Sequence, residues 1–258
     1  MDLGLNGRVF VVTGGSDGLG YATAKSLLSE GARVAICGRD TRRLDDAAEK
    51  LRAVGGDVLS VPADVTRAED LEALVTTTVD RWGRLDGIVN AAGVHTGNRF
   101  ESISDDEWIA DYELKFLAAV RGIRFALPHL RKTAGAVVNV LSTGARAPGK
   151  RGMPSAPLRA AGLSMTKALA TEVGGDGVRI NAMLVGVIRS GQIVRPAVEA
   201  GQDVDEYLDH LARKLGVPLG RIGEPQEFGD TAAFLLSPRA GYVTGTAVHV
   251  DGGLSPVI

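Results

Sequence analysis

The chain has 258 residues, of which 45% are hydrophobic and 23% are charged, as in an ordinary soluble globular protein. Its 29 Lys and Arg residues nearly balance 31 Asp and Glu residues, so no basic surface for nucleic acid or an anionic membrane is expected. The one cysteine, Cys37, excludes an intramolecular disulfide and fits a reducing compartment. No apolar run resembles a signal peptide or approaches the ~18 residues of a membrane-spanning helix. We therefore expect a cytoplasmic protein.

Short apolar runs typical of buried strands alternate with helical patterns along the whole chain. In the first half we expect strands at Val9–Val12, Arg33–Cys37, Val58–Pro62 and Gly87–Asn90, and helices at Tyr21–Glu30, Thr41–Val54 and Ala68–Trp82. In the second half we expect strands at Ala136–Leu141, Val178–Val185 and Ala247–Val250, and helices at Ser104–Leu130, Pro157–Val173, Val204–Leu215 and Glu224–Leu236. This alternation predicts a single α/β domain over residues 1–258, with a doubly wound, mostly parallel seven-stranded sheet and helices on both faces.

A glycine-rich stretch, Thr13–Gly20, follows the first expected strand and opens the first helix. Phosphate oxygens bind backbone N–H groups at a helix N-terminus, where side chains would block their approach. Similar loops form ordinary turns elsewhere, but this position between a buried strand and a helix favours a dinucleotide site. We expect the loop to bind the pyrophosphate through Gly14, Ser16, Asp17, Gly18, Leu19 and Gly20.

Four further motifs make the sequence resemble the short-chain dehydrogenase/reductase family. They are Asp64-Val65, Asn90–Gly93, Arg221–Pro225 and Thr244–Gly253, in this order along the chain. The resemblance covers nearly the whole chain and implies a Rossmann-type fold, an NAD(P)-dependent oxidoreductase acting on a carbonyl or alcohol of a small molecule, and a homo-oligomer, either a tetramer or a dimer. It implies no metal site. It extends the expected cofactor site to Asp64, Val65, Asn90, Ala91, Gly93, Arg159, Gly186, Ile188 and Ser190.

The end of the second strand bears on the choice between the two nicotinamide cofactors. A carboxylate there would repel a 2′-phosphate, but the sequence has Gly38 followed by Arg39. The Arg39 guanidinium can bind a phosphate through two hydrogen bonds, although it can also lie on a solvated edge. Asp17 argues against NADP, because relatives that prefer NADP often have a basic residue there. On balance the sequence predicts NADP as the preferred cofactor, with NAD as the alternative.

The family's Tyr-x-x-x-Lys pair is missing from this chain. Ser142 matches the family's catalytic serine, and counting from it places Ser155 and Arg159 at the tyrosine and lysine positions. An aliphatic hydroxyl is a far weaker acid than a tyrosine, so we expect Ser155 to cap its helix rather than act in catalysis. Arg159 stays protonated and cannot relay a proton, but it can still hold the nicotinamide ribose.

Two other residues can replace the missing proton donor. Lys115 stands at the position of the family's asparagine, where a desolvated lysine can act as an acid or base. Alternatively its stem packs along the helix and its ammonium stays in water. His95 follows the Asn90–Gly93 motif and has an ordinary pKa of about 6.5, although a lone loop histidine is more often only exposed. The sequence leaves both candidates open.

Two segments bear on the substrate. The basic residues Arg146, Lys150 and Arg151 predict an anionic group on the substrate, unless they form a solvated loop. The segment 188–218 contains an amphipathic stretch that predicts a lid, or plain packing. We expect an oxidoreductase in which Ser142 polarises the substrate oxygen. The alternatives are a catalytically silent dinucleotide-binding or scaffold protein, and a non-redox lyase or isomerase on the same fold.

Overall fold

A computed structural model describes residues 2–94 and 96–258. Its seven-stranded sheet has the order β3-β2-β1-β4-β5-β6-β7, and every neighbouring pair is parallel. The strands are β1 (Val9–Thr13), β2 (Arg33–Gly38), β3 (Asp57–Pro62), β4 (Gly87–Asn90), β5 (Ala136–Ser142), β6 (Arg179–Val185) and β7 (Ala247–Val250). All seven predicted strands are confirmed, and no boundary differs by more than one residue. The predicted Rossmann-type α/β fold is therefore correct.

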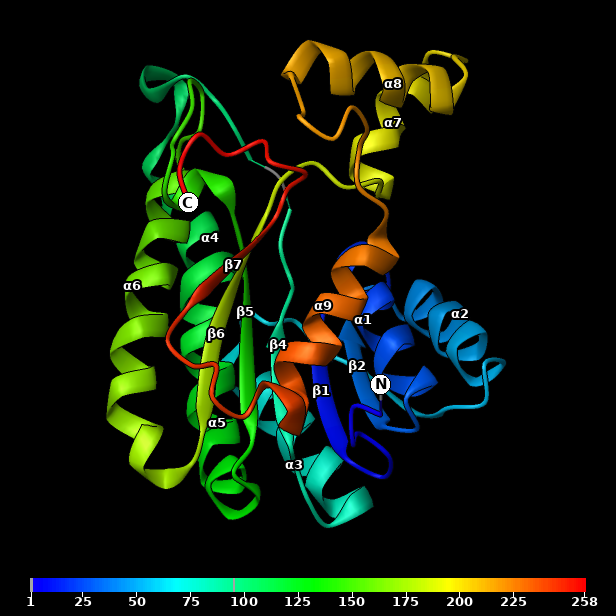
Figure 1. The fold of residues 1–258 in the computed structure, drawn as a ribbon, viewed down its shortest axis with the longest axis vertical. Helices are drawn as coiled ribbons and strands as arrows, with labels where there is room; N and C mark the ends of the chain where they lie inside the picture. The colour runs from blue at the N-terminus through cyan, green and yellow to red at the C-terminus, as the bar shows by residue number, and fades with distance from the viewer. Residues whose placement is uncertain (1, 95) are drawn as a thin grey trace.

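Helices cover both faces of this sheet (Figure 1). One layer contains α1 (Gly18–Ser29), α2 (Thr41–Arg52) and α9 (Pro225–Leu236), and the other contains α3 (Ala68–Trp82), α5 (Ala118–Thr133) and α6 (Ser155–Val173). Side chains of β1 alternate between two apolar cores: Phe10 and Val12 belong to one, and Val9 and Val11 to the other. A parallel sheet buried on both faces accounts for the continuous apolar runs in the sequence.

The helical stretch expected over Ser104–Leu130 is continuous but contains a change of helix type. Ser104 forms a capping box with Glu107 ahead of α4 (Asp105–Tyr112). A π-turn, Glu113–Leu117, then joins α4 directly to α5. Such turns are rare inside helices and are frequent at functional sites. The apolar periodicity predicted the helix correctly, but it does not distinguish an α-helical turn from a π-turn.

Two helices extend beyond the carboxyl ends of the strands, in the segment expected to form a lid (Figure 1). They are α7 (Gly191–Glu199) and α8 (Val204–Leu215). The sequence predicted α8 with its observed bounds but missed α7, because Pro196 within it ordinarily breaks a helix. In the described ranges, 2–94 and 96–258, no helix has the length and apolar character needed to cross a membrane.

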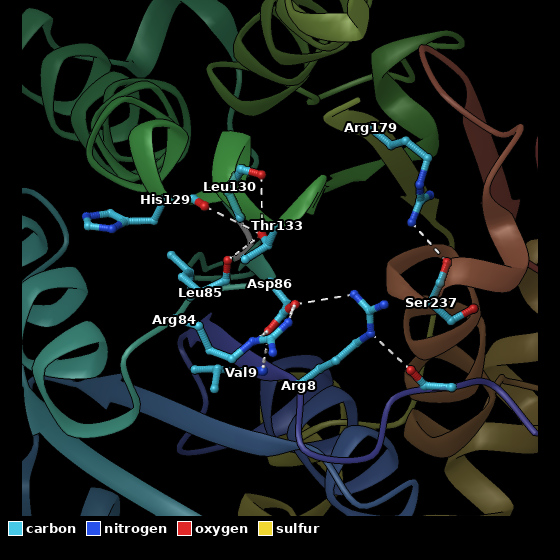
Figure 2. A network of polar contacts seen from close by, with 11 residues as sticks. Arg8, Val9, Arg84, Leu85, Asp86, His129, Leu130, Thr133, Arg179 and Ser237 are labelled. Carbon is cyan, nitrogen blue, oxygen red and sulfur yellow. Dashed lines mark hydrogen bonds and ion pairs between the residues drawn. The ribbon is translucent and has the colours of Figure 1, made fainter. Parts of the chain in front are cut away.

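The amino end of the sheet is held by a buried carboxylate, Asp86, whose side chain is 0% exposed. It accepts hydrogen bonds from Arg84 Nε at 2.8 Å, from Arg8 Nη1 at 3.3 Å and from the Val9 backbone N–H at 2.9 Å. Figure 2 shows the two arginines approaching Asp86 from opposite sides. Since Asp86 precedes β4 and Val9 begins β1, this network fixes the two central strands at the edge where they start.

We expect Asp86→Asn to lower the free energy of unfolding by about 1–3 kcal/mol, because an amide cannot accept from all three donors. Urea denaturation followed by circular dichroism measures the loss. Asp57→Asn is the matched control, since the Asp57 carboxylate also contacts two arginines but is 43% exposed, and its loss should stay below about 1 kcal/mol. Equal losses in the two variants would contradict this interpretation of Asp86.

Candidate active site

A cleft of about 1180 Å³ opens at the carboxyl ends of the strands. A single ligand commonly occupies about 300–1000 Å³, so this cleft has room for a dinucleotide together with a small substrate. Loops that follow β1, β2, β3, β4, β5 and β6 all contribute to it. The predicted site residues that line it are Gly14, Ser16, Asp17, Gly18, Leu19, Gly20, Arg39, Val65, Ala91, Gly93, Ser142, Ser155, Arg159, Gly186, Ile188 and Ser190.

The glycine loop between β1 and α1 packs closely against the turn after β4 and against its own backbone. A Cβ atom at Gly14 would lie 2.9 Å from the Ala92 Cα, and one at Gly20 would lie 2.3 Å from the Gly14 carbonyl oxygen. Only glycine permits these approaches, and Gly14 also has a φ of +67°. The first turn of α1 presents backbone N–H groups without intrahelical partners, and Asp17 accepts from one of them, the Gly18 N–H, at 2.7 Å. This cradle fits the pyrophosphate of a dinucleotide.

Near the end of β2, the cleft is lined by a hydroxyl group from the loop after β1 and by guanidinium groups from the residues after β2. Ser16 Oγ lies 3.1 Å from the place that a Cβ of Gly38 would occupy. Arg39 and Arg43 both line the cleft. The Arg39 side chain is 68% exposed and its Nη1 is 4.0 Å from Asp64 Oδ2, so this ion pair is weak. The guanidinium therefore remains free to contact a bound anion.

Three predicted site residues, Asp64, Asn90 and Lys115, are not part of the cleft lining. Asn90 and Lys115 line a small cavity next to it. Asp64 accepts hydrogen bonds from the Thr66 N–H at 3.0 Å and the Thr66 hydroxyl at 2.8 Å. Burial raises the pKa of Asp64, but these bonds and nearby Arg39 outweigh it and hold that pKa below its ordinary value. Its carboxylate therefore orders the turn behind Arg39. His95, the other candidate proton donor, lies outside the described residues.

Asn139 of β5 is a buried polar residue that was not predicted as part of the site. Its Oδ1 accepts from Asn90 Nδ2 at 2.8 Å, and its Nδ2 donates to Thr166 Oγ1 at 3.0 Å. These bonds join β4, β5 and α6 beneath the cleft. The available signal was the asparagine itself, because a polar residue in the apolar run Ala136–Leu141 must find partners when it is buried.

The ammonium of Lys115 is the most unusual feature of the site. Its side chain is 0% exposed, so the alternative of an ammonium in water is wrong. Nζ lies 2.5 Å from Asp111 Oδ1, 2.5 Å from Thr96 Oγ1 and 3.2 Å from Ser155 Oγ. These three acceptors use all three ammonium hydrogens. The π-turn carries Lys115 to the junction of α4, α6 and the chain after β4.

Asp111 and Thr96 were not predicted as site residues. Asp111 stands four residues before Lys115, a spacing that brings two side chains together on a helix and was the available signal. Thr96 has no such local signal, because it reaches Lys115 from a separate loop. Thr96 Oγ1 also donates to Asp111 Oδ1 at 2.9 Å, so both residues hold the same ammonium.

The prediction that Ser155 caps its helix is wrong. The helix α6 begins at Ser155 itself, Pro154 occupies the capping position, and the helix has no side-chain cap hydrogen bond. The Ser155 hydroxyl instead accepts from Lys115. A hydrogen bond from an ammonium is stronger than one from a neutral backbone N–H, which accounts for the preference.

Arg159 lies one helical turn further along α6. Its Nη1 donates to the Val140 carbonyl at 2.5 Å, and its Nη2 lies 3.0 Å from the place a Cβ of Gly93 would occupy. Its Nε has no hydrogen-bond partner among the described residues. Burial lowers the pKa of Arg159 to about 10, so the guanidinium remains charged at neutral pH.

The electrostatics of the site follow from two cations and one carboxylate. Burial lowers the pKa of Lys115, Asp111 partly opposes that change, and the charge of Arg159 lowers the pKa of Lys115 further. Both cations remain close to Asp111, so the local net charge is positive while Lys115 is protonated. Such a site favours a substrate oxygen on which negative charge develops.

A further part of the cleft lining comes from the segment 188–218 and from the loop after β5. Ile193 of α7 and Tyr207, Leu211 and Leu215 of α8 line the cleft. Two of the three loop cations, Lys150 and Arg151, also line it, whereas Arg146 is exposed away from that lining. The structure therefore brings two of the three predicted basic residues to the cleft and leaves the third outside it.

Comparison with known proteins identifies the family. The model of a family described as enoyl-(acyl carrier protein) reductase matches residues 14–255. L-Fucose dehydrogenase of Bos taurus is 38% identical over 250 residues, covering 96% of this chain and 89% of that protein. L-Sorbose reductase from Gluconobacter frateurii, solved with NADPH and L-sorbose, is 34% identical, with a TM-score of 0.95 and 100% of both chains covered.

A second solved structure is also similar to this chain. It is the NADPH-bound short-chain oxidoreductase from Pseudomonas aeruginosa PAO1, described as containing an atypical catalytic center. It is 35% identical to this chain, with a TM-score of 0.92, and the alignment covers 97% of this chain and 98% of that one. The fold, the glycine cradle and these matches show that the chain belongs to the short-chain dehydrogenase/reductase family of NAD(P)-dependent oxidoreductases.

Proposed function

We propose that the protein transfers a hydride between NADP and a carbonyl or alcohol carbon of a small polar substrate, with Ser142 polarising the substrate oxygen. The observation that carries this proposal is the grouping of Ser142, Ser155 and Arg159 on one cleft surface with Gly93 and Gly186. The bound nicotinamide would supply the hydride. Ser142 donates a hydrogen bond to the substrate oxygen, and the buried Lys115 is the proton source in place of the missing tyrosine.

The substrates to test first are sugars and sugar acids. L-Fucose dehydrogenase and L-sorbose reductase are both similar to this chain over most of its length. Lys150 and Arg151 on the cleft wall supply cations that a carboxylate or phosphate on the substrate can contact. We also infer a lid function for 188–218, a homo-oligomeric state and a cytoplasmic location, all of which remain predictions.

The preference for NADP is supported by the group at the end of β2. Ser16, Arg39 and Arg43 line that part of the cleft, and the sugar reductase and the oxidoreductase described above were both solved with NADPH. Asp17, the residue that argues against NADP, also lines the cleft. Its carboxylate accepts from the Gly18 N–H and lies beside Gly191 of α7.

We expect Arg39→Glu to weaken NADPH binding about 10–100-fold, because a charge-assisted contact to the 2′-phosphate is replaced by repulsion. Fluorescence titration with NADPH and NADH measures both dissociation constants. Arg42→Glu makes the same charge change at an exposed neighbour outside the cleft lining and should alter NADPH affinity only slightly. Tighter binding of NADH than of NADPH by the unmodified protein would overturn the preference.

Replacing Ser142 tests the catalytic assignment. Ser142→Ala should lower kcat/KM for carbonyl reduction about 100–1000-fold, the usual loss for a donor to a developing oxyanion. The rate of NADPH consumption is measured by absorbance with a panel of sugars, sugar acids and other carbonyl compounds. NADPH affinity is the control and should remain unchanged, since only the substrate oxygen is meant to contact this hydroxyl. Retention of the full rate would exclude Ser142 from the reaction.

A further inference from the structure

The proton source and the substrate are separated in this site. The Lys115 side chain is 0% exposed, so its ammonium cannot touch a molecule bound in the cleft. Two hydroxyl groups that accept hydrogen bonds from it, those of Thr96 and Ser155, belong to residues that line the cleft. Each of these hydroxyls can therefore connect Lys115 with a molecule bound in the cleft.

The hydrogen bonds of the two hydroxyls distinguish them. Thr96 Oγ1 donates its hydrogen to Asp111 Oδ1 at 2.9 Å, on the buried side of the ammonium. Ser155 Oγ accepts from Lys115 Nζ at 3.2 Å, and within the described part of the chain its own hydrogen has no acceptor. Ser155 shares the cleft surface with Ser142. Its hydrogen is therefore available to a substrate oxygen placed between the two serines.

We propose that Ser155 relays a proton from Lys115 to the substrate oxygen, an assignment that rests on the proposed reductase function. During reduction the carbonyl carbon gains a hydride and its oxygen forms a new O–H bond with the Ser155 hydrogen. As that Ser155 O–H bond breaks, Ser155 Oγ takes a hydrogen from Lys115 Nζ and leaves a neutral amine. A proton from solvent restores the ammonium through the emptied cleft after the alcohol departs. Oxidation of the alcohol runs through the same bonds in reverse.

The surroundings of Lys115 suit this role. Asp111 from α4 holds the ammonium in place, and Arg159 from α6 supplies a second positive charge near the same carboxylate. When Lys115 loses its proton, Asp111 keeps a cationic neighbour in Arg159, so the buried carboxylate is not left without compensation. Because burial and Arg159 lower the pKa of Lys115, the neutral amine is more accessible than for a lysine in water.

A thiol in place of the Ser155 hydroxyl tests the relay without any substrate. The variant Ser155→Cys should react with iodoacetamide, since the residue faces the cleft, and its new thiol should titrate below the ordinary value of about 8.5. Cys37 does not interfere, because burial raises its pKa to about 12. Adding Lys115→Met should raise the pKa of the introduced thiol by about one unit or more.

Two further variants keep this test interpretable. If Lys115→Met leaves Asp111 unpaired and the protein fails to fold, Asp111→Asn with Lys115→Met removes both charges together. Lys167→Met is the matched control, because Lys167 is an exposed lysine of α6, the helix that carries residue 155. Its loss should leave the titration of the introduced thiol unchanged. An introduced thiol that does not react in the folded protein, or that titrates alike with and without Lys115, would overturn the proposal.

The kinetic test uses any carbonyl compound that the unmodified enzyme reduces. Its kcat/KM should fall as pH rises through the pKa of Lys115, below the ordinary lysine value of about 10.4, because only the ammonium can donate. Ser155→Ala and Lys115→Arg should each lose about 100-fold or more with NADPH affinity kept. Lys115→Arg retains the charge beside Asp111, so a purely structural role for Lys115 predicts an active variant.

The outcomes separate the relay from the reductase function. An enzyme that reduces a carbonyl compound at full rate, and with an unchanged pH profile, after Ser155→Ala would overturn the relay and leave the function standing. An unmodified protein that consumes no NADPH with any carbonyl compound would overturn the function, whereas the effect of Lys115 on the titration of the introduced thiol would still be observed.

Discussion

The loop between β1 and α1 lies so close to its neighbours that three of its positions have no room for a Cβ atom. At Gly14, Gly15 and Gly20 such an atom would lie 2.9, 2.6 and 2.3 Å from the Ala92 Cα, the Ile36 Cγ2 and the Gly14 carbonyl oxygen. These approaches hold β1, β2 and the turn after β4 at one edge of the sheet. The cleft, the first turn of α1 and the cationic end of β2 are placed by this contact, so the cofactor half of the site depends on it.

The proposed catalytic half of the site depends on a different interaction, the buried ion pair of Lys115 and Asp111. Burying two charges is unfavourable unless their remaining hydrogen-bonding atoms are satisfied. Here Thr96 and Ser155 take the other two ammonium hydrogens, whereas Asp111 Oδ2 has no hydrogen-bond partner among the described residues. The tyrosine and lysine of the family are therefore not simply lost. Their positions hold Ser155 and Arg159. The ammonium of Lys115, whose pKa is lowered, is supplied by the π-turn between α4 and α5. In the proposed relay, acid chemistry is retained with a different set of side chains.

The Asp86 network and the cleft lie at opposite ends of the central strands. Asp86 with its arginines fixes the amino ends of β1 and β4 (Figure 2), and the cleft occupies the carboxyl ends, where parallel strands commonly build their sites. Asn139 adds a polar connection on the cleft side, because it joins β4, β5 and α6 beneath the cleft. The rigid sheet thus supports the side chains of the site, while α7 and α8 form a wall of the cleft beyond the strand ends.

The sequence by itself determined the fold, all seven strands and the glycine cradle, because apolar periodicity and glycine requirements are local properties of the chain. The resemblance of the sequence to the family also located Ser142, Ser155, Arg159 and Lys115, because each stands at a position of the family's catalytic pattern. Only the tertiary structure decided what those side chains contact. Lys115 is buried and Ser155 is its acceptor because α4, α6 and the loop holding Thr96 pack together, and residues 19 and 40 positions apart meet there. Such contacts depend on packing between distant elements, which no local pattern records.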